Sequence, residues 1–74
     1  MLKYTILRES LEGLTETIIY HDCILASLPL IGYSMVFYYG DNRMVRTSEV
    51  TIIMEFLDHI EVQTLNSLYT IRKV

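Results

Sequence analysis

Two alternating runs of strand-forming residues flank a three-residue turn in the middle of the chain, and this feature constrains the fold most. Residues 33–39 (YSMVFYY) and residues 43–47 (RMVRT) are rich in β-branched and aromatic side chains or alternate apolar with polar ones. Gly40, Asp41 and Asn42 between them tolerate positive φ and are typical of tight turns. The pattern predicts a β-hairpin over residues 33–47.

The first third of the chain shows the same period-two alternation. Residues 2–7 predict a first strand, followed by a turn over residues 9–13. Residues 15–20 are β-branched and aromatic, and they predict a second strand that His21 and Asp22 close. Residues 23–32 contain Leu-Pro-Leu, which would break a central strand, so we expect a buried connection or an edge there.

The last third predicts a second hairpin, in which residues 60–64 and 68–72 flank Asn66 and Ser67. The segment over residues 48–57 fits two patterns. Its apolar residues alternate as in a strand, but others have helical spacing, with Ser48 available as an N-cap. Because residues 51–53 include β-branched Thr, Ile and Ile and lie between two hairpins, we favour a strand.

These patterns together define an all-β protein. Its 74 residues form one domain over residues 1–74, because independent cores below roughly 40 residues usually need disulfides or metals. Five to seven short antiparallel strands in so short a chain predict a small SH3-like barrel or a two-layer sandwich. A chain this short cannot hide all of its apolar side chains, so some are left for a partner or a second copy.

The single cysteine and the pattern of apolar residues indicate where in the cell the protein is located. Cys23 has no partner for an internal disulfide, and a lone thiol suits a reducing environment. The first residues lack the pattern of a secretory signal. The longest apolar stretch, residues 24–39, is too short and too interrupted to span a membrane. We therefore expect a cytoplasmic protein without membrane association.

Side chains that could carry chemistry are few. His21 and Cys23 would share one face of a strand, but two ligands do not make a zinc site, and a surface histidine beside a buried thiol is the simpler interpretation. Asp58 and His59 are typical of a solvated turn. The three glycines are isolated and form no phosphate-binding loop. We predict no catalytic, cofactor-binding or metal-binding residues, and a protein that is not an enzyme.

Six tyrosines in 74 residues are the unusual feature of the composition. Tyrosine combines an apolar ring with a polar tip, so it serves as an interface anchor or as the roof of a small core, and both interpretations stay open. The first hairpin carries the densest group of side chains that serve as interface hot spots. The predicted partner-binding residues on it are Tyr33, Tyr38, Tyr39, Arg43 and Arg46.

Acidic residues complete the predicted contact surface. The net charge is −3, and Glu9, Glu12 and Glu16 lie in a segment without Lys or Arg. Such segments are also typical of solvated faces. Because acidic segments repel phosphate backbones, direct nucleic-acid binding is disfavoured, whereas a basic protein target would be attracted.

Two short stretches carry a resemblance to known proteins. Residues 46–50 (RTSEV) and residues 64–69 (TLNSLY) match an R-T-S-x-V stretch and a T-x-N-S-x-Y stretch. In these stretches the chain resembles small β-rich proteins encoded by phages and prophages of Gram-positive bacteria. Such products include inhibitors of host defence systems, anti-CRISPR proteins among them, and also assembly and regulatory factors. The resemblance transfers no catalytic residue.

Three functions follow as hypotheses. The leading one is a non-enzymatic inhibitor that acts in the host cytoplasm and binds a host defence protein, such as a basic nucleic-acid-binding effector. The second is a structural or regulatory phage protein that forms a homodimer through a sheet edge. The third is a small barrel that binds single-stranded nucleic acid through Tyr38, Tyr39, Arg43 and Arg46, although two arginines are few for that task.

Overall fold

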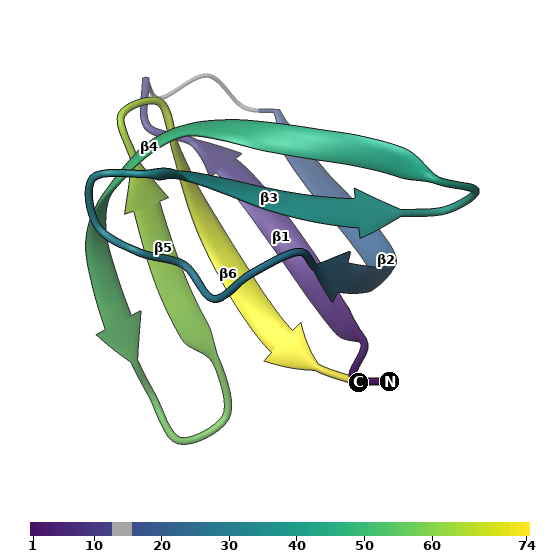
Figure 1. Cartoon of the computed structure of the whole chain (residues 1–74). Helices are drawn as coiled ribbons and strands as arrows, with labels where there is room; N and C mark the ends of the chain where they lie inside the picture. The colour runs from purple at the N-terminus through teal and green to yellow at the C-terminus, as the bar shows by residue number, and fades with distance from the viewer. Residues whose placement is uncertain (13–15) are drawn as a thin grey trace.

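The computed structural model of the chain describes residues 1–12 and 16–74, and these residues form six antiparallel strands. Each strand pairs with the next one in sequence, and β6 pairs with β1, so the sheet closes into a barrel (Figure 1). The all-β prediction is confirmed, and the barrel is the alternative that forms. The strands are β1 (Tyr4–Ser10), β2 (Thr17–Leu25), β3 (Ser34–Tyr39), β4 (Arg43–Glu55), β5 (Ile60–Thr64) and β6 (Ser67–Lys73).

Both predicted hairpins form. In the first, Tyr39 of β3 lies opposite Arg43 of β4, and the turn between them contains Gly40 and Asn42 with the expected positive φ. In the second, β5 and β6 are joined by a turn at residues 65–66, and Ser67 already belongs to β6. The contested segment over residues 48–57 is a strand as far as Glu55, where β4 ends.

The turn predicted over residues 9–13 begins later than expected. β1 continues through Glu9 and Ser10, because these residues pair with Leu68 and Ser67 of β6. Cross-strand pairing with β6 therefore extends a segment whose local composition favours a turn. Residues 13–15, which include the predicted start of the second strand, lie outside the described residues.

The predicted end of the second strand was wrong. β2 does not stop at His21 and Asp22 but continues to Leu25. Asp22 has a φ of 52° and lies where the register with β1 shifts, between the pairs Tyr4–Cys23 and Ile6–Tyr20. Such a β-bulge bends the strand without ending it. The connection that follows, residues 26–33, is mostly exposed, so of the two alternatives predicted for residues 23–32 the buried connection does not form.

The core fills the interior of the barrel and is largely aromatic. Phe37 is completely buried, and its ring contacts the rings of Tyr20 and Tyr69 edge-on, with centroids 5.2 and 6.1 Å apart. The other buried apolar residues are Ile6, Cys23, Met35, Val50, Val62 and Ile71. Two of the six tyrosines therefore belong to the core itself.

A second β-bulge uses a buried threonine. The register between β3 and β4 shifts between Ser34–Glu49 and Val36–Arg46, so the Met35 N–H loses its ladder partner. The Thr47 hydroxyl accepts that N–H at 2.9 Å and donates to the Ser48 carbonyl at 2.7 Å. One side chain thus satisfies the backbone at the irregularity that bends the sheet.

Replacing this hydroxyl tests its role in the bulge. We expect Thr47→Val to lower the free energy of unfolding by about 1–3 kcal/mol, because the buried Met35 N–H is left without an acceptor while the side-chain volume is conserved. Urea denaturation followed by circular dichroism measures the change. The matched control is Thr51→Val on the same strand, since its exposed hydroxyl donates to the Gln63 carbonyl at 3.2 Å and should contribute little. Equal losses in the two variants would contradict this assignment.

Candidate partner-binding surface

An apolar row crosses three strands on the outer wall of the barrel. Ile24 of β2 lies opposite Tyr38 of β3, which lies opposite Met44 of β4. Directly opposed residues of antiparallel strands share a face, with Cβ atoms about 5 Å apart. Tyr38 is 43% exposed and Met44 is 56% exposed, although both are large and apolar in most of their surface. We call Ile24, Tyr38 and Met44 the outer row.

A second pair borders the outer row on the same face. Val36 lies opposite Arg46, two residues along from Tyr38 and Met44, and period-two alternation places this pair beside the row. Val36 is half-buried and Arg46 is exposed. The surface therefore combines aromatic, aliphatic and arginine side chains, the composition typical of an interface core.

Tyr39 and Arg43 belong to the opposite face of the hairpin. They lie opposite each other, on the same face as buried Phe37. The half-buried Tyr39 ring packs edge-on against Tyr20, with centroids 4.8 Å apart. The structure thus separates two residues that are adjacent in sequence, placing Tyr38 on the surface and Tyr39 against the core.

The remaining predicted residues lie away from the outer row. Tyr33 is exposed but precedes β3, and its carbonyl accepts the Val50 N–H at 2.9 Å. Glu9, Glu12 and Glu16 are all exposed, and Glu9 lies between Thr17 of β2 and Leu68 of β6. Thr17 and Ile24 are at opposite ends of β2, about 20 Å apart along an extended strand. These glutamates can act on a partner of the outer row only at long range.

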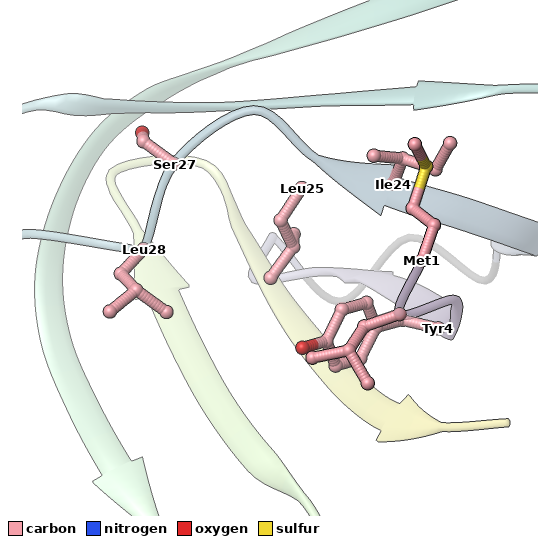
Figure 2. A pocket seen from close by; sticks show the side chains of 7 residues that line it. Met1, Tyr4, Ile24, Leu25, Ser27 and Leu28 are labelled. Carbon is pink, nitrogen blue, oxygen red and sulfur yellow. The ribbon is translucent and has the colours of Figure 1, made fainter.

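A pocket of about 300 Å³ adjoins the outer row at Ile24. Figure 2 shows Tyr4, Leu25 and Leu28 around it, with Met1 beside Ile24. Most of its lining is aliphatic or aromatic, and its hydroxyl groups are those of Tyr4 and Ser27. The hollow can take an apolar side chain of a bound protein.

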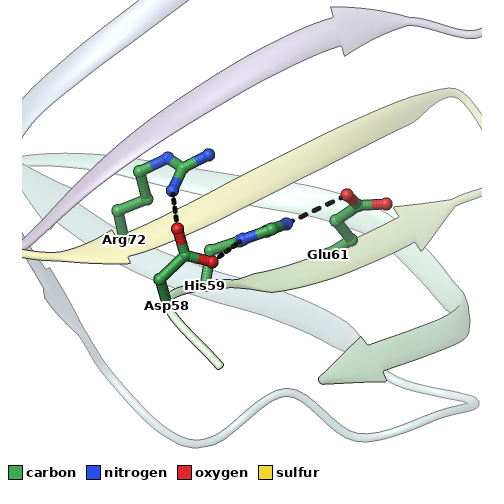
Figure 3. Close-up of polar contacts among 4 residues, drawn as sticks. All are labelled: Asp58, His59, Glu61 and Arg72. Atoms are coloured by element: carbon green, nitrogen blue, oxygen red, sulfur yellow. Dashed lines mark hydrogen bonds and ion pairs between the residues drawn. The ribbon is translucent and has the colours of Figure 1, made fainter. Parts of the chain in front are cut away.

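A second cluster lies at the β4–β5 turn and is polar (Figure 3). The two ring nitrogens of His59 lie 2.7 Å from Asp58 Oδ1 and 3.1 Å from Glu61 Oε2. Arg72 of β6 donates to the other oxygen of Asp58 at 3.0 Å. Sequence reasoning treated Asp58 and His59 as a solvated turn and missed this cluster. Two sequence patterns indicate it. Alternation places His59 and Glu61 on one face, and the register of the second hairpin places Arg72 opposite His59.

This geometry favours the charged form of the histidine. A neutral imidazole has one N–H, so only the imidazolium donates to both carboxylates at once. The pKa of His59 is raised, first by its hydrogen bond to Asp58 and then by that to Glu61. The pKa of Asp58 is lowered, first by His59 and then by Arg72. Because both ring nitrogens are occupied, the arrangement stabilises the turn and leaves no nitrogen for a metal or for general-base catalysis.

Stability should therefore depend on pH through His59. The raised pKa means that the histidine stabilises the fold fully below its ordinary value of 6.5, and that this stabilisation is lost as pH rises through the higher pKa of the folded state. We expect the Tm to fall as the pH rises above the ordinary histidine pKa of 6.5, and the fall to shrink in His59→Gln. The control is His21→Gln, the other histidine of the chain, which is exposed. An unchanged pH dependence in His59→Gln would contradict the assignment.

The cysteine has the environment of a structural residue. Cys23 is completely buried, and burial is the main cause that raises the pKa of its thiol. Neighbouring His21 is exposed, so the two side chains are not presented together. Within residues 1–12 and 16–74, no group of three His, Cys, Asp or Glu residues has the arrangement of a metal site.

Comparisons with known proteins assign neither a family nor a function to this chain. No family model matches the chain, and no curated protein or solved structure matches it. In the described part of the chain, no helix is long and apolar enough to cross a membrane.

Proposed function

We propose that this chain is a non-enzymatic protein-binding module whose contact surface is the outer row with Val36 and Arg46. The observation that carries the proposal is the exposure of Tyr38 and Met44 side by side on the barrel wall. Monomeric proteins rarely leave large apolar side chains grouped on one face unless a partner covers them.

The class of partner we propose is a bacterial defence protein, which the chain would inhibit by occupying its working surface. The support for this finer proposal is the resemblance of residues 46–50 and 64–69 to phage-encoded proteins. The exposed Glu9, Glu12 and Glu16 add support for a basic target, because distant acidic groups steer a basic partner toward the barrel without touching it.

Binding of single-stranded nucleic acid finds less support in this geometry. Such binding needs several cations along one groove, together with aromatic rings on which bases stack. Arg43 and Arg46 lie on opposite faces of the hairpin, and so do Tyr38 and Tyr39. Each face therefore offers one arginine and one tyrosine, of which Tyr39 is already packed against Tyr20.

A comparative pull-down tests the proposed function. The bait is the full chain, incubated with lysate of a Gram-positive host, and the variant is Met44→Asp, which places a charge in the outer row. The control is Leu65→Asp, a similarly exposed position at the β5–β6 turn. We expect one protein to be retained by the wild type and the control and lost with Met44→Asp. Retention that is equal for all three baits would overturn the proposal.

A further inference from the structure

The β4–β5 turn forms an apolar projection at one end of the barrel. It extends past the other elements at the end where both chain termini lie (Figure 1). Leu57 at its tip is fully exposed and Phe56 is 44% exposed. The turn is nevertheless ordered by its own contacts, because the Phe56 N–H donates to the His59 carbonyl at 2.9 Å and the two rings stack 4.6 Å apart. A projection held in shape loses little entropy when it docks.

The pocket of about 300 Å³ described above lies at the same end of the barrel, because Met1 and Leu2 at the N-terminus line it. Tyr4 lines it together with Leu25 and Leu28. Tyr4 also lines a second depression, of about 330 Å³, whose other wall includes Phe56 and Leu57. Tyr4 therefore lies between the apolar projection and the apolar pocket.

We propose that this end of the barrel binds a second copy of the chain, with Leu57 of each protomer in the pocket of the other. The projection and the pocket lie on either side of Tyr4. If a two-fold axis passes near this residue, the projection of each copy faces the pocket of the other. Such an isologous contact is the commonest form of homodimer, and it closes after two copies.

The apolar area at this end is what such a dimer needs. Six side chains that are 44–107% exposed gather at this end, and together they supply apolar area on the order of several hundred Å² per protomer, against ~800 Å² of total area per partner in a standard interface. The six are Met1, Leu2, Leu28, Phe56, Leu57 and Val74.

The charges around this end also suit a second copy. Exposed Lys3 lies between Leu2 and Tyr4, which both line the pocket, whereas exposed Glu55 ends β4 just before the projection. The proposed exchange brings the pocket side of one copy against the projection side of the other. Lys3 of one copy then meets Glu55 of the other at the rim. Exposed Lys73 lines the depression beside Leu57, so the surface carries charges of both signs, which favours a partner that also carries both.

Self-association through a sheet edge is less favourable. Among the described residues, β2 pairs with β3 only through Ile24 and Leu25, so its edge over residues 17–22 is open. Antiparallel pairing of two such edges about Ile19 would set Glu16 opposite Asp22 of the other copy. Like charges in opposed positions destabilise a strand pair, and the bulge at Asp22 bends this edge.

Sedimentation velocity on the full chain tests the dimer. We expect the sedimenting mass to rise from that of one copy to that of two as the protein concentration increases from about 1 to about 500 µM. This range corresponds to a weak affinity for an interface of standard size. Leu57→Asp should weaken association by about tenfold or more, because it would place a charge in an apolar pocket. Leu65→Asp, at the opposite end of the barrel, should associate as the wild type does. A monomeric wild type, or equal association of wild type and Leu57→Asp, would overturn the proposal.

Disulfide trapping tests the exchange of side chains. We expect a mixture of Leu57→Cys and Leu28→Cys proteins to form a covalent heterodimer on mild oxidation, and neither variant alone to form a covalent dimer as readily. A preference for the Leu57→Cys homodimer would contradict the arrangement. Met44→Asp should leave self-association unchanged, so failure of the dimer and failure of the proposed partner binding can be told apart.

Discussion

Phe37→Ala should lower the free energy of unfolding by about 3–5 kcal/mol, the range for removing a buried phenylalanine ring from a core. The ring is completely buried and contacts Tyr20 and Tyr69 edge-on, so its loss leaves a cavity and removes two aromatic contacts. A domain of this size has a total stability of only several kcal/mol, so a large fraction of the variant should be unfolded.

The second phenylalanine of the chain provides the control. Phe56 is exposed at the β4–β5 turn, where its ring stacks on His59. Phe56→Ala should therefore cost about 1 kcal/mol or less, measured at a protein concentration where the chain is monomeric. Urea denaturation of both variants gives the comparison. If Phe37→Ala cost no more than Phe56→Ala, the barrel interior would not be packed as described.

Alanine at the two adjacent hairpin tyrosines should separate binding from stability. We expect Tyr38→Ala to weaken partner binding by about 1–3 kcal/mol, roughly 5- to 150-fold, because Tyr38 is the aromatic side chain of the outer row. Tyr39→Ala should leave binding nearly unchanged and lower the free energy of unfolding by about 1–3 kcal/mol. Its ring packs on Tyr20 in the barrel, and this contact is lost.

The measurement combines calorimetric titration of the captured partner with urea denaturation of each variant. Tyr33→Ala is a control for a general effect of tyrosine removal, since Tyr33 is exposed but lies outside the outer row. The opposite outcome, with Tyr39→Ala abolishing binding and Tyr38→Ala mainly destabilising the fold, would place the contact on the other face of the hairpin.

Much of this fold could be predicted because its hairpins are encoded locally. Gly40 and Asn42 adopt the positive φ that their residue types allow, and the alternation beside them specifies which side chains share a face. Alternation alone places the adjacent Tyr38 and Tyr39 on opposite faces of the strand. It could not show which face is buried, because that depends on Tyr20, nineteen positions before Tyr39 in the sequence.

What the sequence could not reveal depends on pairing between distant strands. His21 and Asp22 have the composition of a strand end, but the pairing of Tyr4 with Cys23 carries β2 through a bulge there. Ile24 was not predicted as part of the contact surface for the same reason. Its proximity to Tyr38 requires the register of β2 against β3, and an irregular connection over residues 26–33 separates these strands. Met44 lies opposite Tyr38 in the first hairpin itself, so the predicted hairpin already implied this contact.

The most direct test of the proposed function is photo-crosslinking from the outer row. Met44 is replaced by a photoreactive phenylalanine in one protein and Leu65 in another, since both positions are exposed but lie on different parts of the barrel. We expect irradiation in host cells to give one discrete protein adduct from position 44 and none from position 65. An adduct from position 65 alone, or adducts to nucleic acid rather than protein from position 44, would contradict a protein-binding outer row.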